Sequence, residues 1–162
     1  MKRSVLLSIL VLLVLSIKAQ TDTSVPYKRF PTVPPFSLLQ ADSSVLTKDK
    51  LKKGPVILMF FSPSCDHCQH QVKDMLKRID EFKHIQLVLA TYQPFEEMVA
   101  FISEYKLDKH PNIKVGRDSK YVLPPFYHMQ NLPYLALYDK KGSLVTTYQG
   151  NVSIDTLLKP FQ

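Results

Sequence analysis

Two cysteines separated by two residues offer the clearest chemistry in this sequence. Cys65 and Cys68 are the only cysteines of the 162-residue chain, and thiols at this spacing can alternate between a dithiol and a disulfide. Such a disulfide closes a very small loop, and a structural disulfide stabilises mainly by closing a long one. The spacing therefore predicts a redox couple and disfavours a structural bridge.

The segments around the pair predict its place in the fold. Residues 55–61 are apolar, branched and aromatic, which is typical of a strand buried on both faces. Apolar residues then recur every three or four positions, which predicts a helix over residues 66–83. Cys65 should cap this helix, and Cys68 should lie one turn in on its buried side. Because a helix N-terminus stabilises an anion, we expect Cys65 to be the nucleophilic thiolate and Cys68 the resolving thiol.

The N-terminus has the pattern of a secretory signal peptide. Lys2 and Arg3 precede an apolar stretch over residues 5–17, and the small residue Ala19 follows it. The stretch is shorter than the ~18 to 20 residues that span a bilayer comfortably. We therefore expect cleavage after Ala19 and a periplasmic or extracellular protein. A permanent membrane anchor through residues 5–17 is the alternative.

The rest of the chain alternates between strand and helix patterns, which predicts an α/β domain with parallel central strands. The proline-rich residues 20–35 predict an extended lead-in, and residues 36–162 the domain itself. The further predicted elements are a hairpin of residues 36–40 and 44–46, strands at 85–91 and 112–115, helices at 95–105 and 119–130, a hairpin of 134–138 and 144–148, and a helix at 153–161. In the helix at 119–130, Pro124-Pro125 should cause a bend or an interruption.

Composition narrows the function classes. The apolar content is 45%, which is enough for one domain with a hydrophobic core. The formal net charge is +7. No dense basic run with interleaved aromatic residues is present in the sequence, so nucleic-acid binding is not expected. We expect a monomer.

Further motifs accompany the cysteine pair in the order Pro35-Phe36-Ser37-Leu38, Leu51-Lys52-Lys53-Gly54-Pro55, Val115-Gly116-Arg117-Asp118 and Leu132-Pro133. Together with Cys-x-x-Cys at a helix start, they resemble the thioredoxin superfamily and, more narrowly, the exported TlpA/ResA-like thioredoxins. The resemblance covers roughly residues 35–160. It implies a thioredoxin fold, in which helices flank a central mixed β-sheet, here with an N-terminal β-hairpin.

The same resemblance implies a function. The implied activity is that of a thiol-disulfide oxidoreductase, which exchanges electrons with protein thiols and disulfides. It is implied to need no cofactor beyond the Cys65/Cys68 couple. A membrane-bound electron donor is a candidate partner. Pro133 matches the family's cis proline, which lies against the active-site disulfide. With Leu132 it is implied to bind the backbone of an extended substrate.

Residues near the pair should tune it. His67 can stabilise the reduced form through its partial positive charge, whereas Asp66 opposes this effect, so we expect a small net result. Met59 stands where conventional thioredoxins have a buried carboxylate, and the chain has no tryptophan. A thioether cannot carry a proton to or from Cys68, so we expect slower exchange.

Two other functions stay open. Cys65, His67, Cys68 and His70 form a mixed sulfur and nitrogen set suited to copper or zinc, although Cys68 and His70 lie on adjacent helical faces. A redox-inactive thioredoxin-like binding module is the other alternative. A peroxidatic site is disfavoured, because Leu58 stands where peroxiredoxins have a proline.

Overall fold

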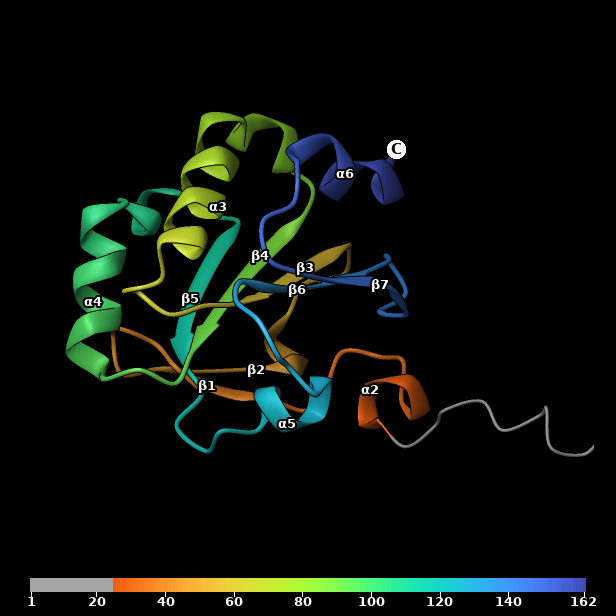
Figure 1. Ribbon diagram of the computed structural model, residues 1–162, viewed down its shortest axis with the longest axis horizontal. Coiled ribbons are helices and arrows are strands. Elements are labelled where there is room, and N and C mark those ends of the chain that lie inside the picture. The colour runs from red at the N-terminus through yellow and green to blue at the C-terminus, as the bar shows by residue number, and fades with distance from the viewer. Residues whose placement is uncertain (1–24) are drawn as a thin grey trace, which may run out of the picture.

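A seven-stranded mixed β-sheet with helices on both faces organises the computed structural model, which describes residues 25–162 (Figure 1). The predicted signal peptide, its cleavage after Ala19 and the alternative anchor at residues 5–17 lie outside the described residues. Within residues 25–162, no helix is long and apolar enough to cross a membrane.

Three parallel strands form the centre of the sheet: β3 (Val56–Phe60), β4 (Gln86–Thr91) and β5 (Ile113–Arg117). β4 lies between the other two and pairs with both in parallel. Every residue of β3 is buried. The strand predicted from the apolar run at 55–61 is therefore confirmed as one covered on both faces.

Antiparallel strands complete the two sides of the sheet. β6 (Tyr134–Tyr138) pairs with β3 and forms a hairpin with β7 (Leu144–Gln149). On the other side, β1 (Ser37–Leu39) pairs with β5 and forms a hairpin with β2 (Val45–Thr47). The strand order is β2-β1-β5-β4-β3-β6-β7. Both predicted hairpins and the parallel centre are confirmed.

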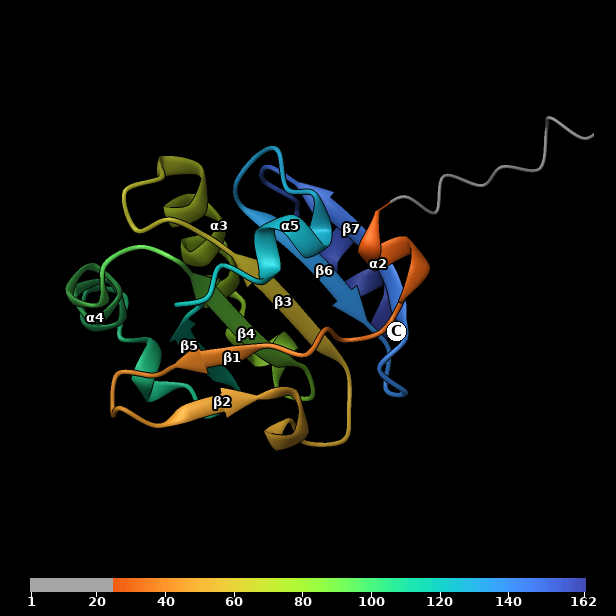
Figure 2. The same cartoon turned by 90° about the horizontal axis from the view of Figure 1, so that it is seen from below.

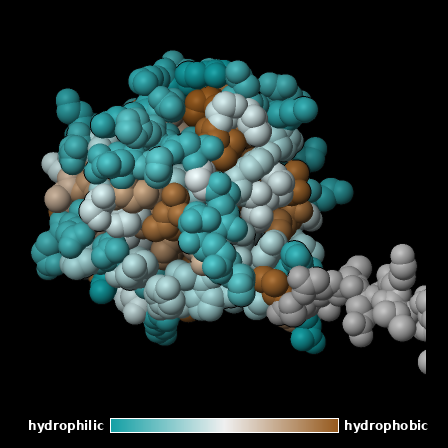
Figure 3. All heavy atoms as spheres, viewed as in Figure 1, coloured by the Kyte–Doolittle hydropathy of each residue, from teal (hydrophilic) through white to brown (hydrophobic). Residues whose placement is uncertain are grey.

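Helices cover both faces of the sheet (Figures 1 and 2). One face carries α3 (Asp66–Lys77), α4 (Phe95–Glu104) and α6 (Ile154–Leu158), whose apolar side chains pack with those of β3 and β4 into one core cluster. The other face carries α5 (Leu123–Tyr127) and the helical turn α2 (Pro26–Arg29), which contribute to a second cluster. On the face of Figure 3, polar residues cover most of the surface, so the helices turn their polar sides outward.

Two predicted helices are shorter in the structure. The helix expected at 66–83 ends after Lys77, because Arg78 leaves the helical region (φ −120°, ψ 28°), and a 3₁₀ turn follows over Ile79–Phe82. The helix expected at 119–130 is reduced to the five residues of α5. Of the expected bend or interruption at Pro124-Pro125, the structure shows the interruption: residues 119–122 are not helical, and the prolines lie in the first turn of α5, where a missing N–H is not needed.

The expected extended lead-in is partly helical, since α2 lies within it. Thr32 then forms an isolated β-bridge with Ser143, and the N–H of Val33 donates to the carbonyl of Gly142 at 3.3 Å. The Val33 side chain is buried in the second core cluster. Packed structure therefore begins before residue 36, and it ties the start of the described chain to the β6–β7 turn.

Candidate redox site

Cys65 is the N-cap residue of α3. Its backbone is extended (φ −88°, ψ 112°), and its Sγ atom accepts a hydrogen bond from the backbone N–H of Cys68 at 3.2 Å. This bond satisfies one of the N–H groups that the first turn of a helix leaves free. The Cys65 side chain is partly buried against the core cluster beneath α3. The predicted cap position is confirmed.

Cys68 lies one turn into α3 and is fully buried. Desolvation of its sulfur strongly raises the pKa of the Cys68 thiol, and the hydrogen bond to Cys65 raises it further. Both cysteines are free thiols. Cys65 is therefore the more accessible of the two residues, and the Cys68 thiol keeps its proton at neutral pH.

Hydrogen bonds within the β3–α3 loop hold Cys65 in place. The carbonyl of Ser62 accepts from the N–H of Cys65 at 3.1 Å, and the hydroxyls of Ser62 and Ser64 lie 3.1 Å apart. The amide of Gln69 donates to the carbonyl of Pro63 at 2.9 Å. The loop is thus fastened to the helix that follows it.

A second loop carries Leu132 and Pro133, whose shared peptide bond is cis. The carbonyl of Pro133 accepts from the N–H of Gly150 at 2.9 Å. The side-chain oxygen of Gln149 accepts from the N–H groups of residues 130–131 at 3.0 and 2.9 Å. The end of β7 and the residues after it therefore position the Leu132-Pro133 loop.

The same segment after β7 also binds the start of α3. The amide of Asn151 donates to the carbonyl of His67 at 2.7 Å. Gln71, only 1% exposed, donates to the carbonyl of Val152 at 3.1 Å and accepts from its N–H at 2.7 Å. Residues 149–152 therefore connect the helix that carries both cysteines with the loop that carries Pro133.

The positioning residues Gln71, Gln149 and Asn151 were not found from the sequence. Only Gln71 left a signal there, because a glutamine three residues after Cys68 falls on the apolar face of the helix. The cis peptide bond expected at Pro133 is confirmed, whereas the expected contact between Pro133 and Cys65 stays a prediction.

Asp66 and His67, the two predicted tuning residues, are exposed in the first turn of α3. Their side chains therefore lie in solvent beside the pair. Their tuning roles, like the roles assigned to the cysteines and to the Leu132-Pro133 loop, belong to the proposal below.

Met59 is the fourth residue of β3 and is fully buried in the same core cluster as Cys68. Among the described residues, the one buried carboxylate is Asp118. One of its oxygens accepts from the N–H of Leu123 at 2.8 Å, and the side chain of Leu123 packs into the core of the opposite face. Met59 therefore leaves its position in the cysteine-side core without a proton acceptor.

The residues considered for a metal site do not converge. The Nδ1 atom of His70 lies 2.8 Å from the carbonyl oxygen of Asp66, so the ring turns back along its own helix. In the part of the chain that the structure describes, no three His, Cys, Asp or Glu side chains are grouped to hold a metal ion.

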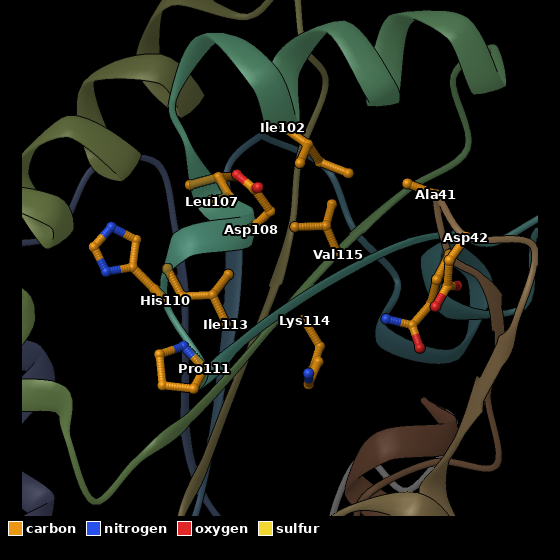
Figure 4. A pocket seen from close by; sticks show the side chains of 11 residues that line it. Ala41, Asp42, Ile102, Leu107, Asp108, His110, Pro111, Ile113, Lys114 and Val115 are labelled. Carbon is orange, nitrogen blue, oxygen red and sulfur yellow. The ribbon is translucent and has the colours of Figure 1, made fainter.

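A cavity of about 250 Å³ lies apart from the redox pair. Figure 4 shows it between Ile102 of α4, Val115 of β5 and Asp42 in the β1–β2 turn. Neither cysteine lines it, and neither does the Leu132-Pro133 loop. The cavity is therefore separate from the candidate redox site.

Two exposed tyrosines lie beyond the C-terminal ends of the parallel strands. This is the end of the sheet that also carries the redox pair. Tyr92 follows β4 and is 41% exposed, and Tyr121, beyond the end of β5, is 52% exposed. Their rings meet edge to face with centroids 5.2 Å apart, and Tyr92 also stacks on Phe60 at 6.0 Å. This edge therefore presents an aromatic surface to solvent.

Comparisons with known proteins identify the family and the fold of the chain. The AhpC/TSA family matches residues 31–158. The thioredoxin-like protein SkfH of Bacillus subtilis (strain 168) is 29% identical over 108 residues, which are 64% of this chain and 74% of that protein.

Two solved structures show the same architecture. StoA from Bacillus subtilis is 22% identical, with a TM-score of 0.63 over 82% of this chain and 100% of that one. A secreted disulfide oxidoreductase of Mycobacterium tuberculosis is 18% identical, with a TM-score of 0.62 over 74% and 86% of the two chains. The thioredoxin fold implied by the sequence resemblance is therefore confirmed. With a family match that covers most of its length, the chain belongs to the AhpC/TSA family.

Proposed function

We propose that this thioredoxin-like thiol-disulfide oxidoreductase works outside the cytoplasm and exchanges electrons with protein thiols through a Cys65/Cys68 dithiol-disulfide couple. One observation carries the proposal: the N–H of Cys68 donates to a partly exposed Cys65 sulfur, while the Cys68 sulfur is buried one turn away. This arrangement gives the two thiols different roles in one exchange reaction.

In the first step, the Cys65 thiolate attacks one sulfur of a client disulfide. A bond forms between Cys65 and that sulfur, the client S–S bond breaks, and the other client sulfur leaves as a thiolate that takes up a proton. The helix N-terminus and the Cys68 N–H favour negative charge on the Cys65 sulfur, so Cys65 is the attacking group.

In the second step, Cys68 loses its proton and its thiolate attacks the Cys65 sulfur. The mixed disulfide breaks, the second client sulfur leaves as a thiolate, and a Cys65–Cys68 disulfide forms. Two electrons have then passed to the client, and a dithiol donor must reduce the pair again. The same steps in reverse oxidise a client dithiol.

The Leu132-Pro133 loop is proposed to bind the client backbone beside Cys65. The support is indirect and structural: the loop and the first turns of α3 are hydrogen-bonded to the same segment, residues 149–152. An extended client held along this loop would approach α3 from its N-terminal side. Client disulfides and thiols are the partners that this chemistry requires, and the chain needs no further cofactor for it.

Trapping of the mixed disulfide tests the proposal. We expect Cys68→Ser, incubated with a disulfide-bonded client such as insulin, to accumulate a covalent complex through Cys65, because the resolving thiol is absent. The matched variant Cys65→Ser should trap far less, since the buried Cys68 sulfur is out of reach. Equal trapping by both variants, or none by either, would contradict the assigned roles.

Two observations support the location outside the cytoplasm. One is the signal-peptide pattern before residue 20, and the other is that one structural relative, from Mycobacterium tuberculosis, is a secreted protein. Expression of the full chain with mass analysis of the exported product tests it. A product that begins near Gln20 supports the proposal. Retention of residues 1–19 in a protein that stays in the cytoplasm contradicts it.

A further inference from the structure

The end of the molecule opposite the redox pair is rich in lysine. The parallel strands β3, β4 and β5 begin at this end, whereas Cys65 follows the point where β3 ends. A pocket of about 380 Å³ lies there. Its lysine lining residues are Lys50, Lys52, Lys53, Lys83 and Lys114.

A second pocket of about 300 Å³ adjoins the first and shares Lys52 and Lys53 with it. It adds Lys48 from the segment after β2 and Lys140 and Lys141 from the β6–β7 turn. No acidic side chain lines either pocket. We call the two pockets together the basic pole.

Nearby acids neutralise little of this charge. Asp80 forms an exposed ion pair with Lys83 at 3.0 Å. The Asp139 carboxylate accepts hydrogen bonds from the backbone N–H groups of Lys141 and Ser143 at 2.8 and 2.9 Å, so it stabilises the β6–β7 turn. Asp49 lies in the turn beside Lys48. The remaining lysines leave a clear positive excess.

Apolar groups accompany the charge. The first pocket is also lined by Leu46, Ile85 and Val88, so carbon atoms form part of its wall. Phe30 is 57% exposed, and the guanidinium of Arg29 lies 5.3 Å from the centre of its ring. The bridge between Thr32 and Ser143 places this short segment beside the β6–β7 turn, which carries lysines of the second pocket.

We infer that the basic pole docks on an anionic phospholipid surface. Lysines next to an anionic bilayer each contribute about a five-fold gain in binding, and exposed aromatic or apolar groups add insertion at the interface. A free phosphate would need only one of the pockets. Two adjoining cationic pockets and an exposed aromatic side chain fit an extended charged surface better.

This docking would orient the redox site. A strand rises about 3.3 Å per residue, so the five residues of β3 separate the basic pole from the Cys65 loop by roughly 17 Å. The cysteines and the exposed tyrosines would then face away from the lipid, toward soluble clients.

Vesicle sedimentation of the exported product, which lacks the apolar stretch at residues 5–17, tests the inference. Binding to neutral phosphatidylcholine vesicles gives the baseline, and vesicles that also contain phosphatidylglycerol report the contribution of charge. We expect the anionic vesicles to bind more protein, and the difference to vanish at high salt, where screening lengths fall to a few ångströms. Lys52→Gln/Lys53→Gln/Lys140→Gln should reduce this charge-dependent partitioning on the order of 100-fold.

The matched control removes the same charge elsewhere. Lys73→Gln/Lys106→Gln/Lys120→Gln changes exposed lysines that line neither pocket, and we expect at most a few-fold loss. Equal losses of vesicle binding in both triple variants would show that net charge alone explains the binding, and would overturn the inference. So would no preference for anionic vesicles.

A separate arm distinguishes lipid from a free anion. If inorganic phosphate releases the protein from anionic vesicles more strongly than sodium chloride of equal ionic strength, the pole is a phosphate site and the membrane inference is wrong. Modification of Cys65 by an impermeant maleimide should proceed equally with and without vesicles, and protection by vesicles would contradict the orientation. No sedimentation readout uses redox activity, so failure here leaves the proposed function standing.

Discussion

The backbone N–H of Cys68 donates to the sulfur of Cys65 across 3.2 Å, so the two residues of the pair are in contact while both thiols are free. The contact places a helix N–H on the sulfur that is proposed to react with clients. The other sulfur is buried, and burial strongly raises the pKa of the Cys68 thiol. The second step of exchange, which needs the Cys68 thiolate, is therefore the step that the surroundings hinder.

We expect the resolution step to accelerate with pH. Because the raised pKa keeps Cys68 protonated at neutral pH, its thiolate fraction should rise about tenfold for each pH unit. The decay of a preformed mixed disulfide between Cys65 and a small aromatic thiol, followed from pH 6 to 9, measures this step. Cys68→Ser is the control that should not resolve. A flat profile would contradict a buried, protonated resolving thiol.

Stability of the reduced protein should fall at alkaline pH. The ordinary pKa of a cysteine thiol is 9.0, and burial raises that of Cys68 in the folded state. The folded protein therefore keeps a proton that the unfolded chain releases above about pH 9, so the stabilisation is complete below that pH and is lost as pH rises. The slope approaches about 1.4 kcal/mol per pH unit.

Chemical denaturation of reduced wild type and of Cys68→Ser between pH 8 and 10.5 measures this effect as a difference. The comparison is needed because burial also raises the pKa of Tyr134 to about 12 and that of Tyr127 above its ordinary value. Those tyrosines contribute equally to both proteins. Parallel stability curves for the two proteins would show that Cys68 does not titrate as expected.

The sequence predicted the local parts of the site because local patterns determine them. The run at β3 is apolar because both faces of that strand are covered, and helical periodicity after it placed Cys65 at the cap. The hydrogen bond between Gln71 and Val152 could not be predicted in this way, because 81 positions of sequence separate the two residues. No periodicity predicts a side chain whose partner is a backbone segment at the other end of the fold.

The grouping of lysines at the basic pole could not be predicted from the sequence either. The lysines of the basic pole extend from Lys48 to Lys141 and nowhere form a long run, so in sequence they are typical of a solvated surface. The direction of the strands in the sheet brings them to one end. The short α5 was missed for a local reason: proline is tolerated in a first turn, and the pattern around Pro124 suggested a longer helix.

Gln71→Leu should weaken both stability and exchange. Leucine fits the apolar face of α3 but leaves the N–H and the carbonyl of Val152 without their partner, which should cost about 2 kcal/mol or more. Because the same segment holds Pro133, we also expect slower client reduction. Thermal unfolding and insulin reduction measure the two effects. Lys73→Leu, on the exposed side of the same helix, loses only the contact of its ammonium with the Tyr105 ring at 5.7 Å and should change stability by about 1 kcal/mol or less.

Loss of stability in Gln71→Leu with an unchanged exchange rate would show that residues 149–152 support the fold but do not position the client loop. A milder variant separates the two effects further. Asn151→Ala removes only the bond to the carbonyl of His67 at an exposed site. We expect little change in stability and a measurable loss of exchange rate.

Met59→Asp should accelerate resolution at neutral pH. The Met59 side chain lies in the same buried cluster as Cys68, and we expect the introduced carboxyl to accept the Cys68 proton. Burial raises the pKa of such a carboxyl toward neutrality, where it is most useful as a base. We expect at least a roughly tenfold faster decay of the mixed disulfide at pH 7, at a stability cost of about 1 to 3 kcal/mol for the buried polar group.

Met59→Asn is the matched control, because its amide has nearly the same size and polarity but cannot accept the proton. The proton-transfer explanation requires that Met59→Asp flattens the rise of the rate with pH while Met59→Asn leaves it unchanged. Equal acceleration by both variants would mean that a looser core, and not a proton acceptor, speeds the reaction. A folded Met59→Asp protein that resolves no faster than wild type would show that Met59 does not limit the chemistry of Cys68.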